Sequence, residues 1–288
     1  MLIQTIVLGL ITGFIYALTG AGLVSVYRTS RIINFAQASI GTVGLYVAYP
    51  LVSLGAPYWL VAIAVIAAAA LTSVIVGTIV NFVAGRREEL LGGLAAIAAS
   101  LAIEGILTLT VGGTALAFPS LGNQTLFTLG SVGITAANVG VIVVATIAFI
   151  LLGLLFSRTT IGIGMRAISE NSTAAQTIGL QRTALRLASW LIGGVLAGMA
   201  ALFLVPLFSL TPDSIAGEIV YGFAAVVIGG FDSIAGALVA GVALGIISNL
   251  IGVYLNLNVM TFGLFIVMLA VLLVRPFGLF GRRPLERV

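Results

Sequence analysis

Long apolar runs separated by short polar segments make up nearly the whole chain. A transmembrane helix needs about 20 mostly apolar residues, because the hydrocarbon core of a bilayer is about 30 Å thick. Runs that approach this length cover residues 2–27, 35–54, 58–84, 90–112, 138–156, 187–208, 220–230, 234–255 and 259–274. The run 220–230 is short, so it either spans the membrane or re-enters it. The pattern predicts an all-α fold, a polytopic transmembrane helical bundle of eight to nine spans forming one domain over residues 1–288.

The charged residues indicate how these spans are oriented. All twelve basic residues are arginine, and with nine spans they fall in the segments on one side, 28–34, 85–89, 157–186, 231–233 and 275–288. The loops on the other side, 55–57, 113–137, 209–219 and 256–258, contain none. Basic residues accumulate in short cytoplasmic loops. We therefore expect a periplasmic N-terminus, a cytoplasmic C-terminus and a multi-pass location in a bacterial inner membrane.

The composition of the chain supports a location in a lipid bilayer and excludes several kinds of catalytic and metal site. The chain is 61% hydrophobic and 7% charged, whereas a soluble domain is about 25% charged. The net charge of +4 does not indicate nucleic-acid binding, because the arginines form no dense patch with aromatic residues. Histidine and cysteine are absent, which excludes the usual zinc sites and thiol or imidazole chemistry. An enzyme is therefore disfavoured, and we expect no cofactor.

Four polar residues inside apolar runs are candidates for a substrate pathway. Asn34, Gln37 and Ser39 lie at the start of the second run. They either cap a helix or mark a discontinuous helix that lines a cavity. Glu104 lies near the middle of the fourth run, where a carboxyl usually faces the bundle interior. It is either a pathway residue or a structural carboxyl that is hydrogen-bonded to a neighbouring helix.

Two further features have simple structural explanations. Asp213 and Glu218 on an outer loop either dock a soluble partner or are solvated loop residues. Three pairs of glycines have the G-x-x-x-G spacing that allows close helix approach, and we interpret them as packing positions. These pairs are Gly9/Gly13, Gly194/Gly198 and Gly241/Gly245.

The most informative polar stretch is the cytoplasmic loop at about residues 158–186. It predicts one short helix over about 164–170 and a second that begins at the Asn171/Ser172 cap and ends at Gly179. Met165 and Ile168 are three residues apart and share a face. Such a helix lies on lipid or enters a groove on a partner. The small number of basic residues favours a partner.

This loop and three other segments resemble the branched-chain amino acid ABC permease family, in particular its LivH-type subunit. The four segments agree in order and spacing along nearly the whole chain. They are 166–179 (RAISENSTAAQTIG), 31–36 with 44–49 (RIINFA, GLYVAY), 229–237 (GGFDSIAGA) and 275–281 (RPFGLFG).

The resemblance implies a permease subunit of an ATP-driven importer for branched-chain or related amino acids, forming half of the translocation pathway. It implies a second homologous permease, two cytoplasmic ATPases that bind the ATP, and a periplasmic substrate-binding protein. The loop would couple to an ATPase through Gly164, Arg166, Ala167, Glu170, Asn171 and Gly179. The sequence contains no G-x-x-x-x-G-K-[ST] motif for binding nucleotide. A permease subunit is expected to lack this motif, because its partners bind the ATP.

One departure from the family pattern leaves the substrate open. After Asn-Phe-Ala the family has His, Gly and an acidic residue, whereas this chain has Gln37, Ala38 and Ser39. Urea and short amides are therefore alternatives to amino acids. A stand-alone secondary transporter or channel is the other class of function, with Glu104 as its ion or proton carrier.

Overall fold

The computed structural model describes residues 2–85, 89–129 and 132–281, and most of them are helical. In chain order the elements are α1 (Leu2–Ser30), α2 (Gln37–Ser53), α3 (Tyr58–Ala84), α4 (Glu89–Val111), β1 (Thr125–Leu129), β2 (Val132–Thr135), α5 (Ala136–Arg158), α6 (Thr160–Glu170), α7 (Ser172–Thr177), α8 (Arg182–Leu204), α9 (Ile219–Gly229), α10 (Ile234–Tyr254) and α11 (Leu257–Val274). Two short 3-10 turns, Val205–Leu207 and Ala216–Glu218, flank the loop before α9.

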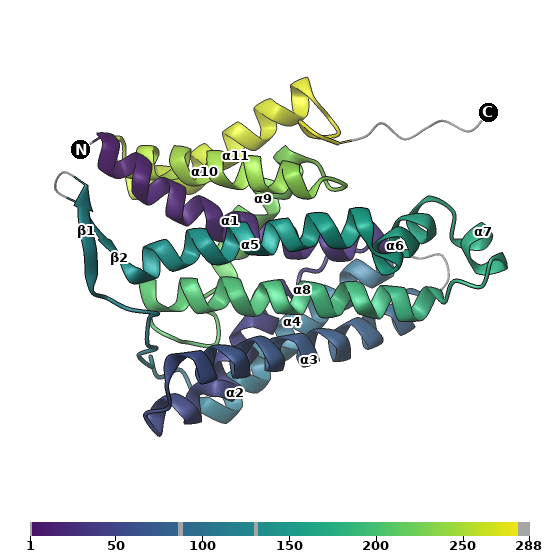
Figure 1. The fold of residues 1–288 in the computed structure, drawn as a ribbon, viewed down its shortest axis with the longest axis horizontal. Helices are drawn as coiled ribbons and strands as arrows, with labels where there is room; N and C mark the ends of the chain where they lie inside the picture. The colour runs from purple at the N-terminus through teal and green to yellow at the C-terminus, as the bar shows by residue number, and fades with distance from the viewer. Residues whose placement is uncertain (1, 86–88, 130–131, 282–288) are drawn as a thin grey trace.

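The long helices lie side by side as a bundle (Figure 1). The β-hairpin lies at the end where α1 begins, and α6 and α7 lie at the opposite end. Each apolar run of the sequence corresponds to one helix, so the predicted helical bundle is confirmed. Six helices of the described chain are long and apolar enough to cross a membrane: α1, α3, α4, α5, α8 and α10. The other three helices from the apolar runs, α2, α9 and α11, are shorter.

The prediction of an all-α chain is wrong at one place. Residues expected to form an irregular loop instead contain an antiparallel hairpin, in which Thr125 pairs with Thr135 and Phe127 with Ile134. The two strands are rich in threonine and also contain valine, isoleucine and phenylalanine, residue types that favour strands. The hairpin leads directly into α5, since β2 ends at Thr135 and α5 begins at Ala136. The Ala136 amide also donates to the Gln124 carbonyl at 3.2 Å.

Helix α8 begins earlier than the sequence suggested. The predicted span began at residue 187, whereas the helix begins at Arg182. Arg182 and Arg186 therefore lie on its first two turns and not in a loop. Arginine has a high helix propensity, so a charged segment next to an apolar run extends the helix beyond the apolar part.

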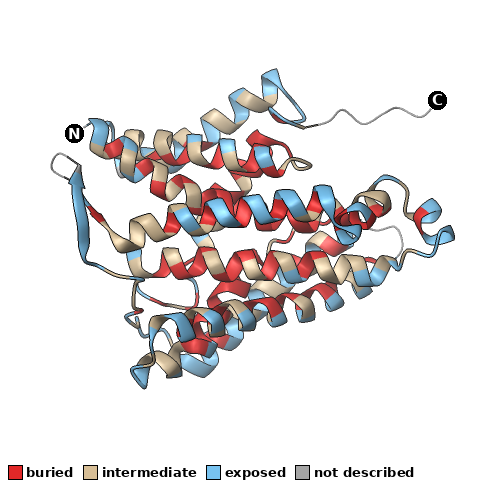
Figure 2. Cartoon of the chain, viewed as in Figure 1, coloured by how far each residue is buried: buried red, intermediate tan, exposed pale blue. Residues whose placement is uncertain are grey.

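Helices α1 and α8 form the centre of the bundle, and α4 lies at its periphery. Of the most apolar 18 residues in each helix, 67% are buried in α1 and 61% in α8, but only 11% in α4 (Figure 2). Large apolar side chains point outward on the peripheral helices, among them Leu109 (89% exposed) and Phe82 (86% exposed). Contiguous apolar surface of this kind requires an apolar surrounding. The exposed surface therefore fits a bilayer or further membrane helices.

The three predicted glycine pairs all lie at close helix crossings. Gly9 and Gly13 of α1 face Gly241 and Gly245 of α10, and Gly194/Gly198 of α8 face α3. A Cβ on Gly13 would lie 2.7 Å from the Val242 Cα. The interpretation as packing positions is confirmed, because a larger side chain would push these helices apart.

We expect Gly13→Ala to destabilise the bundle and Gly105→Ala not to. The first substitution forces α1 away from α10, and overpacking of this kind costs about 1–3 kcal/mol. Gly105 is also within a helix, but a Cβ there would meet nothing within 4 Å. Thermal unfolding in the same detergent measures both variants. Equal losses of stability would show that the crossing is not tightly packed.

The arginines of the described chain gather at one end of the bundle. Arg31 bonds to Asp232, and the Arg28 guanidinium lies 4.9 Å from the Phe156 ring at the end of α5. Arg182 and Arg186 line a cavity together with Gly85 at the end of α3. Arg86, Arg87, Arg282, Arg283 and Arg287 lie outside the described residues. We call the end that holds α6 and α7 the arginine end.

Candidate functional site

Two breaks between helices meet at the arginine end. Residues 31–36 connect α1 to α2 without regular structure, and residues 230–233 connect α9 to α10. Arg31 Nη1 donates to Asp232 Oδ1 at 3.0 Å and to Oδ2 at 3.3 Å. Arg31 has a φ of 61°, which is uncommon for a residue other than glycine. The ion pair therefore joins two breaks that are 201 positions apart in the sequence.

Aromatic rings extend the contact between the two breaks. The rings of Tyr27 and Phe231 are 4.8 Å apart, Phe223 and Phe231 are 5.9 Å apart, and Phe35 and Phe223 are 6.1 Å apart. Aromatic pairs at such distances each contribute about 0.5–1.5 kcal/mol beyond burial of their area. Helices α1 and α9 are thus linked by side chains at their arginine ends.

The C-terminal segment packs on the second break. The Leu279 amide donates to the Ile228 carbonyl at 2.7 Å, and the Phe280 amide donates to the Gly229 carbonyl at 3.0 Å. Gly278 and Gly230 both have positive φ, and a Cβ on Gly278 would lie 2.7 Å from the Gly230 Cα. Three of the four segments that carry the family resemblance therefore converge here: 31–36, 229–237 and 275–281.

Asn34 and Gln37 form a buried amide network at the start of α2. Asn34 Nδ2 donates to Gln37 Oε1 at 2.8 Å, and Gln37 Nε2 donates to the Gly193 carbonyl of α8 at 3.0 Å. Asn34 Oδ1 also accepts from the Ala36 amide. The exposed fractions of the two side chains are 0% and 1%. Because Gly193 lies in the middle of α8, α2 begins well inside the bundle, as a discontinuous helix does.

Replacing Gln37 should cost stability, because its partners cannot reach water. We expect Gln37→Leu to lower the free energy of unfolding by about 1–3 kcal/mol, since the Asn34 amide would be left unpaired and the Gly193 carbonyl would lose its second donor. Gln124→Leu is the matched control, because Gln124 is exposed before β1. Denaturant or thermal unfolding of the purified chain distinguishes the two. A tolerated Gln37→Leu would contradict the network.

Ser39 and Glu104 lie together, as part of a second polar cluster between α2 and α4. Ser39 Oγ donates to Glu104 Oε1 at 2.9 Å and lies 2.7 Å from Ser100 Oγ. Ser100 Oγ lies 3.3 Å from the same carboxyl oxygen. The carboxyl is therefore hydrogen-bonded to a neighbouring helix, one of the two roles considered from the sequence. Ser100 belongs to this cluster and was missed, because a serine in an apolar helix has no distinctive pattern.

Asp213 and Glu218 occupy different environments, although the sequence placed them in one loop. Asp213 is exposed and its carboxylate accepts from Thr211 Oγ1 at 2.9 Å. Glu218 ends the 3-10 turn before α9, and burial raises the pKa of its carboxyl. It lines a cavity of about 10 Å³ with Gln37 and Thr19. The structure thus places Glu218 near the pathway candidates and only Asp213 on the surface.

The loop at about 158–186 contains the two predicted helices, but the first is longer. It begins at Thr160 with Thr159 as its cap, four residues before the predicted start at Gly164. Met165 and Ile168 share a buried face, with exposed fractions of 0% and 4%. This face packs against α1, α5 and α8 of the same chain. A partner would therefore meet the other face of α6, or α7, and the apolar face is not available to it.

Helix α7 has the predicted start and end. Asn171 Oδ1 accepts from the Ala174 amide at 3.0 Å, which caps the first turn. Gly179 has a φ of 87°, and its amide donates to the Gln176 carbonyl at 3.0 Å. The Leu180 amide donates to the Ala175 carbonyl at 3.1 Å. These two bonds make a Schellman motif, which needs a left-handed residue at Gly179.

The exposed apolar tip of this segment was not predicted from the sequence. Ile178 is 75% exposed beside Gly179, at the end of α7. Arg166 lies on α6, where its Nε is inaccessible and has no hydrogen-bond partner within the described residues. Glu170 is exposed at the end of α6, and Gly164 and Ala167 lie on the same helix. The segment therefore has an exposed apolar tip at Ile178, while the unpaired Nε of Arg166 is buried.

The described residues form no group of three or more His, Cys, Asp or Glu side chains that could hold a metal ion. The polar clusters consist of amides, hydroxyls and single carboxyls. Such groups bind polar ligands or position helices.

Comparisons with known proteins agree with this arrangement. Residues 5–274 match the family model described as "Branched-chain amino acid transport system / permease component". The chain is 31% identical over 280 residues to the "Probable branched-chain amino acid transport permease protein LivH" of Methanocaldococcus jannaschii, covering 92% of this chain and 88% of the relative.

Two further proteins resemble the chain. It is 28% identical over 297 residues to the "High-affinity branched-chain amino acid transport system permease protein LivH" of Escherichia coli K12, covering 97% and 96% of the two chains. A chain of PsaBC from Streptococcus pneumoniae aligns in structure with a TM-score of 0.45 and 12% identity, covering 94% of this chain and 89% of that one. The family match over most of the sequence and the convergence of the family segments at one end lead to one conclusion: the chain belongs to the family of branched-chain amino acid transport system permease components.

Proposed function

We propose that the chain is the permease subunit of an ATP-driven ABC importer for branched-chain or related amino acids. The observation that carries this proposal is the family match over residues 5–274. The printed names of the relatives describe branched-chain amino acid transport permeases. The chain supplies a pathway and no ATPase site of its own, and ATP is bound by partner subunits.

One chain forms half of the pathway. The cavity beside Gln37 and Glu218 measures about 10 Å³, which is room for about one water molecule and far too little for an amino acid. A passage between two permeases gives the substrate the room that one chain lacks. The outward apolar surface of the bundle pairs with a second, homologous permease to form it. Asn34, Gln37, Ser39 and Glu104 hold the helices next to that passage, and Glu218 joins them from the 3-10 turn before α9.

The arginine end faces the cytoplasm of a bacterial inner membrane, because short cytoplasmic loops are rich in arginine. The N-terminus is then periplasmic, and the bundle makes about nine passes if α2, α9 and α11 also cross. Asp213 lies on the periplasmic side, where it docks the basic groups of a substrate-binding protein.

ATP hydrolysis acts on this chain through α6 and α7. The apolar face of α6 holds the segment on its own bundle, while Ile178 and Gly179 project from it. Two cytoplasmic ATPases bind below, one of them with this tip in a groove. A rigid connection of this kind transmits the closing of the ATPases to the helices, which then rock between outward-facing and inward-facing states.

Purification of the tagged chain from native membranes tests the assembly. We expect two ATPase subunits and a second permease to co-purify, and the isolated chain to hydrolyse no ATP. A washed preparation that contains this chain alone and transports solute in vesicles would contradict the proposal and indicate a secondary transporter or channel.

The substrate has one alternative with a specific observation behind it. Gln37, Ala38 and Ser39 replace the residues that the family has at these positions, so urea or a short amide is the second candidate. Uptake of labelled leucine by membrane vesicles, in competition with unlabelled valine, urea and acetamide, distinguishes them. We expect valine to compete; competition by urea or acetamide alone would overturn the amino acid assignment.

A further inference from the structure

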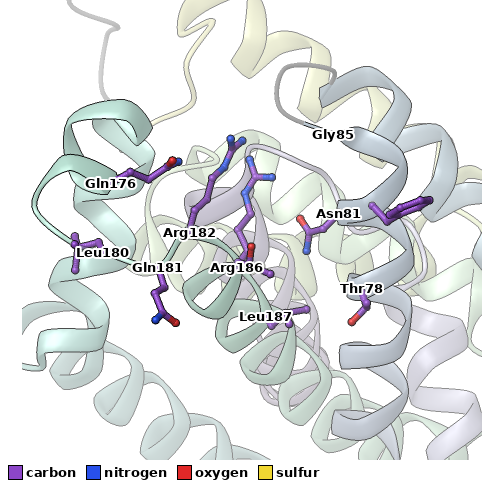
Figure 3. Close-up of a pocket in the computed structure, with 12 residues that line it drawn as sticks. Thr78, Asn81, Gly85, Gln176, Leu180, Gln181, Arg182, Arg186 and Leu187 are labelled. Carbon is purple, nitrogen blue, oxygen red and sulfur yellow. The ribbon is translucent and has the colours of Figure 1, made fainter.

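A cavity of about 810 Å³ opens at the arginine end between the last turns of α3 and the first turns of α8. Figure 3 shows Asn81 of α3 and the guanidinium groups of Arg182 and Arg186 directed toward the same space. The two helices pack tightly one turn deeper, where a Cβ on Gly77 would meet the Trp190 ring. The cavity therefore lies where α3 and α8 diverge beyond this contact.

Polar atoms at the cavity lack partners within the described residues. The Nδ2 and Oδ1 atoms of Asn81 and the Nε of Arg186 are inaccessible and make no hydrogen bond. Native proteins rarely leave buried polar groups unpaired, because each such group costs about 1–3 kcal/mol. When the side chains of Asn81 and Arg186 turn toward a bound ligand that accepts hydrogen bonds, the donors Asn81 Nδ2 and the Arg186 guanidinium gain partners, and the part of the cost that falls on these donors is removed.

The charge around the cavity is suited to an anion. Arg182 and Arg186 are close enough for their guanidinium groups to repel each other, and Glu89 offsets part of that repulsion. The lining within the described residues contains two arginines and no acidic residue. Arg182 also begins α8, whose first amides add partial positive charge. Arginine binds phosphate oxygens with paired hydrogen bonds.

The walls of the cavity continue onto the apolar outer surface of the bundle. Phe82 lines it and is 86% exposed, on the turn of α3 after Thr78. Leu187 lines it from α8. A ligand here has its anionic part among the arginines and can extend along apolar side chains. A free inorganic anion leaves the apolar wall uncovered, whereas a phospholipid covers both parts.

We propose that this cavity binds the phosphate of an anionic phospholipid headgroup, with the acyl chains lying along α3 and α8 beside Phe82. Arg186 and Asn81 are the residues that hold the phosphate. Basic pockets between helices near a membrane surface are suited to anionic lipids. Gln176 and Gly179, at the end of α7, also line the cavity. A bound lipid therefore stabilises the connection between α7 and α8.

Lipid binding to the purified full-length chain tests the proposal. We would measure bound phosphatidylglycerol by native mass spectrometry after the chain is moved from detergent micelles containing phosphatidylcholine into micelles containing mixtures of the two lipids. We expect preferential retention of phosphatidylglycerol, and about five-fold weaker retention in Arg186→Gln, the factor for one arginine near a membrane surface. Arg158→Gln is the matched control, because Arg158 is exposed at the end of α5 and does not line the cavity.

Further measurements distinguish binding of a lipid from binding of a free anion, and loss of binding from a folding defect. Arg186→Lys keeps the charge and should restore part of the retention, while the thermal stability of each variant in phosphatidylcholine alone should match that of the native chain. Equal retention of phosphatidylcholine and phosphatidylglycerol, or unchanged retention in Arg186→Gln, would overturn the proposal. If inorganic phosphate stabilises the chain as much as phosphatidylglycerol does, the cavity is a site for a free anion and the lipid proposal is overturned.

Discussion

Gly179→Pro should reduce uptake by about ten-fold or more while the protein still inserts and folds. Proline fixes φ near −65° and removes the amide hydrogen, whereas Gly179 has a φ of 87° and its amide donates to Gln176. The Schellman turn cannot form, so α7 loses its fixed position relative to α8. Uptake by vesicles, normalised to the amount of inserted protein, measures the effect.

Gly55→Pro is the matched control for this variant. Gly55 also has a positive φ of 70°, its amide donates to the Val52 carbonyl at 3.0 Å, and a Cβ there would meet nothing within 4 Å. The same backbone strain therefore arises at the opposite end of the bundle, between α2 and α3. We expect Gly55→Pro to keep most of the uptake. Equal loss in both variants would mean that Gly179 matters for folding and not for coupling.

Arg166→Glu should also uncouple transport, with a loss of uptake of about ten-fold. Arg166 is half-buried on α6, and its Nε has no hydrogen-bond partner within the described residues. Arg166 also makes no ion pair within the described residues. We therefore expect its guanidinium to pair with an acidic group of an ATPase, which a carboxylate at this position would repel. ATP hydrolysis by the purified complex, measured together with uptake, should persist in the variant without driving transport.

Two other substitutions show whether the charge at this position is the cause. Arg166→Lys keeps the positive charge and should retain an intermediate rate of uptake. Arg158→Glu reverses an exposed charge at the end of α5, outside α6 and α7, and should have little effect. If all three variants transport at the native rate, Arg166 has no part in coupling.

Local sequence pattern predicted the features that depend on neighbouring residues. The long apolar runs correspond to helices because each run satisfies its backbone hydrogen bonds internally, as lipid requires. The Asn171 cap and the Gly179 turn were also predicted, because both follow from the chemistry of one residue and its nearest amides. Met165 and Ile168 share a face as expected from helical spacing.

Features that depend on distant parts of the chain were not predictable in this way. Nothing near Arg31 indicates that Asp232 is its partner, since helix packing creates that contact. The spacing of Met165 and Ile168 predicts an apolar face but not what covers it, and the bundle itself covers it. Ser39 and Glu104 were separate candidates in the sequence, and only the crossing of α2 and α4 brings their side chains together.

The site also shows why polarity alone does not identify a pathway residue. Asn34 and Gln37 are polar and lie inside an apolar run, but their amides are satisfied by each other and by Gly193. Asp213 and Glu218 have the same charge and lie five positions apart, yet only Glu218 lines the inner cavity. Burial and hydrogen-bond partners, which a sequence does not contain, separate these cases.

The central claim, that ATP hydrolysed by partner subunits drives transport through this chain, has one direct test. The complete complex, purified with its partners, is reconstituted into proteoliposomes with the binding protein and labelled leucine on its periplasmic side and nucleotide on its ATPase side. We predict accumulation of leucine with ATP and none with ADP or with an imposed proton or sodium gradient. Accumulation that follows an ion gradient and ignores ATP would contradict the account.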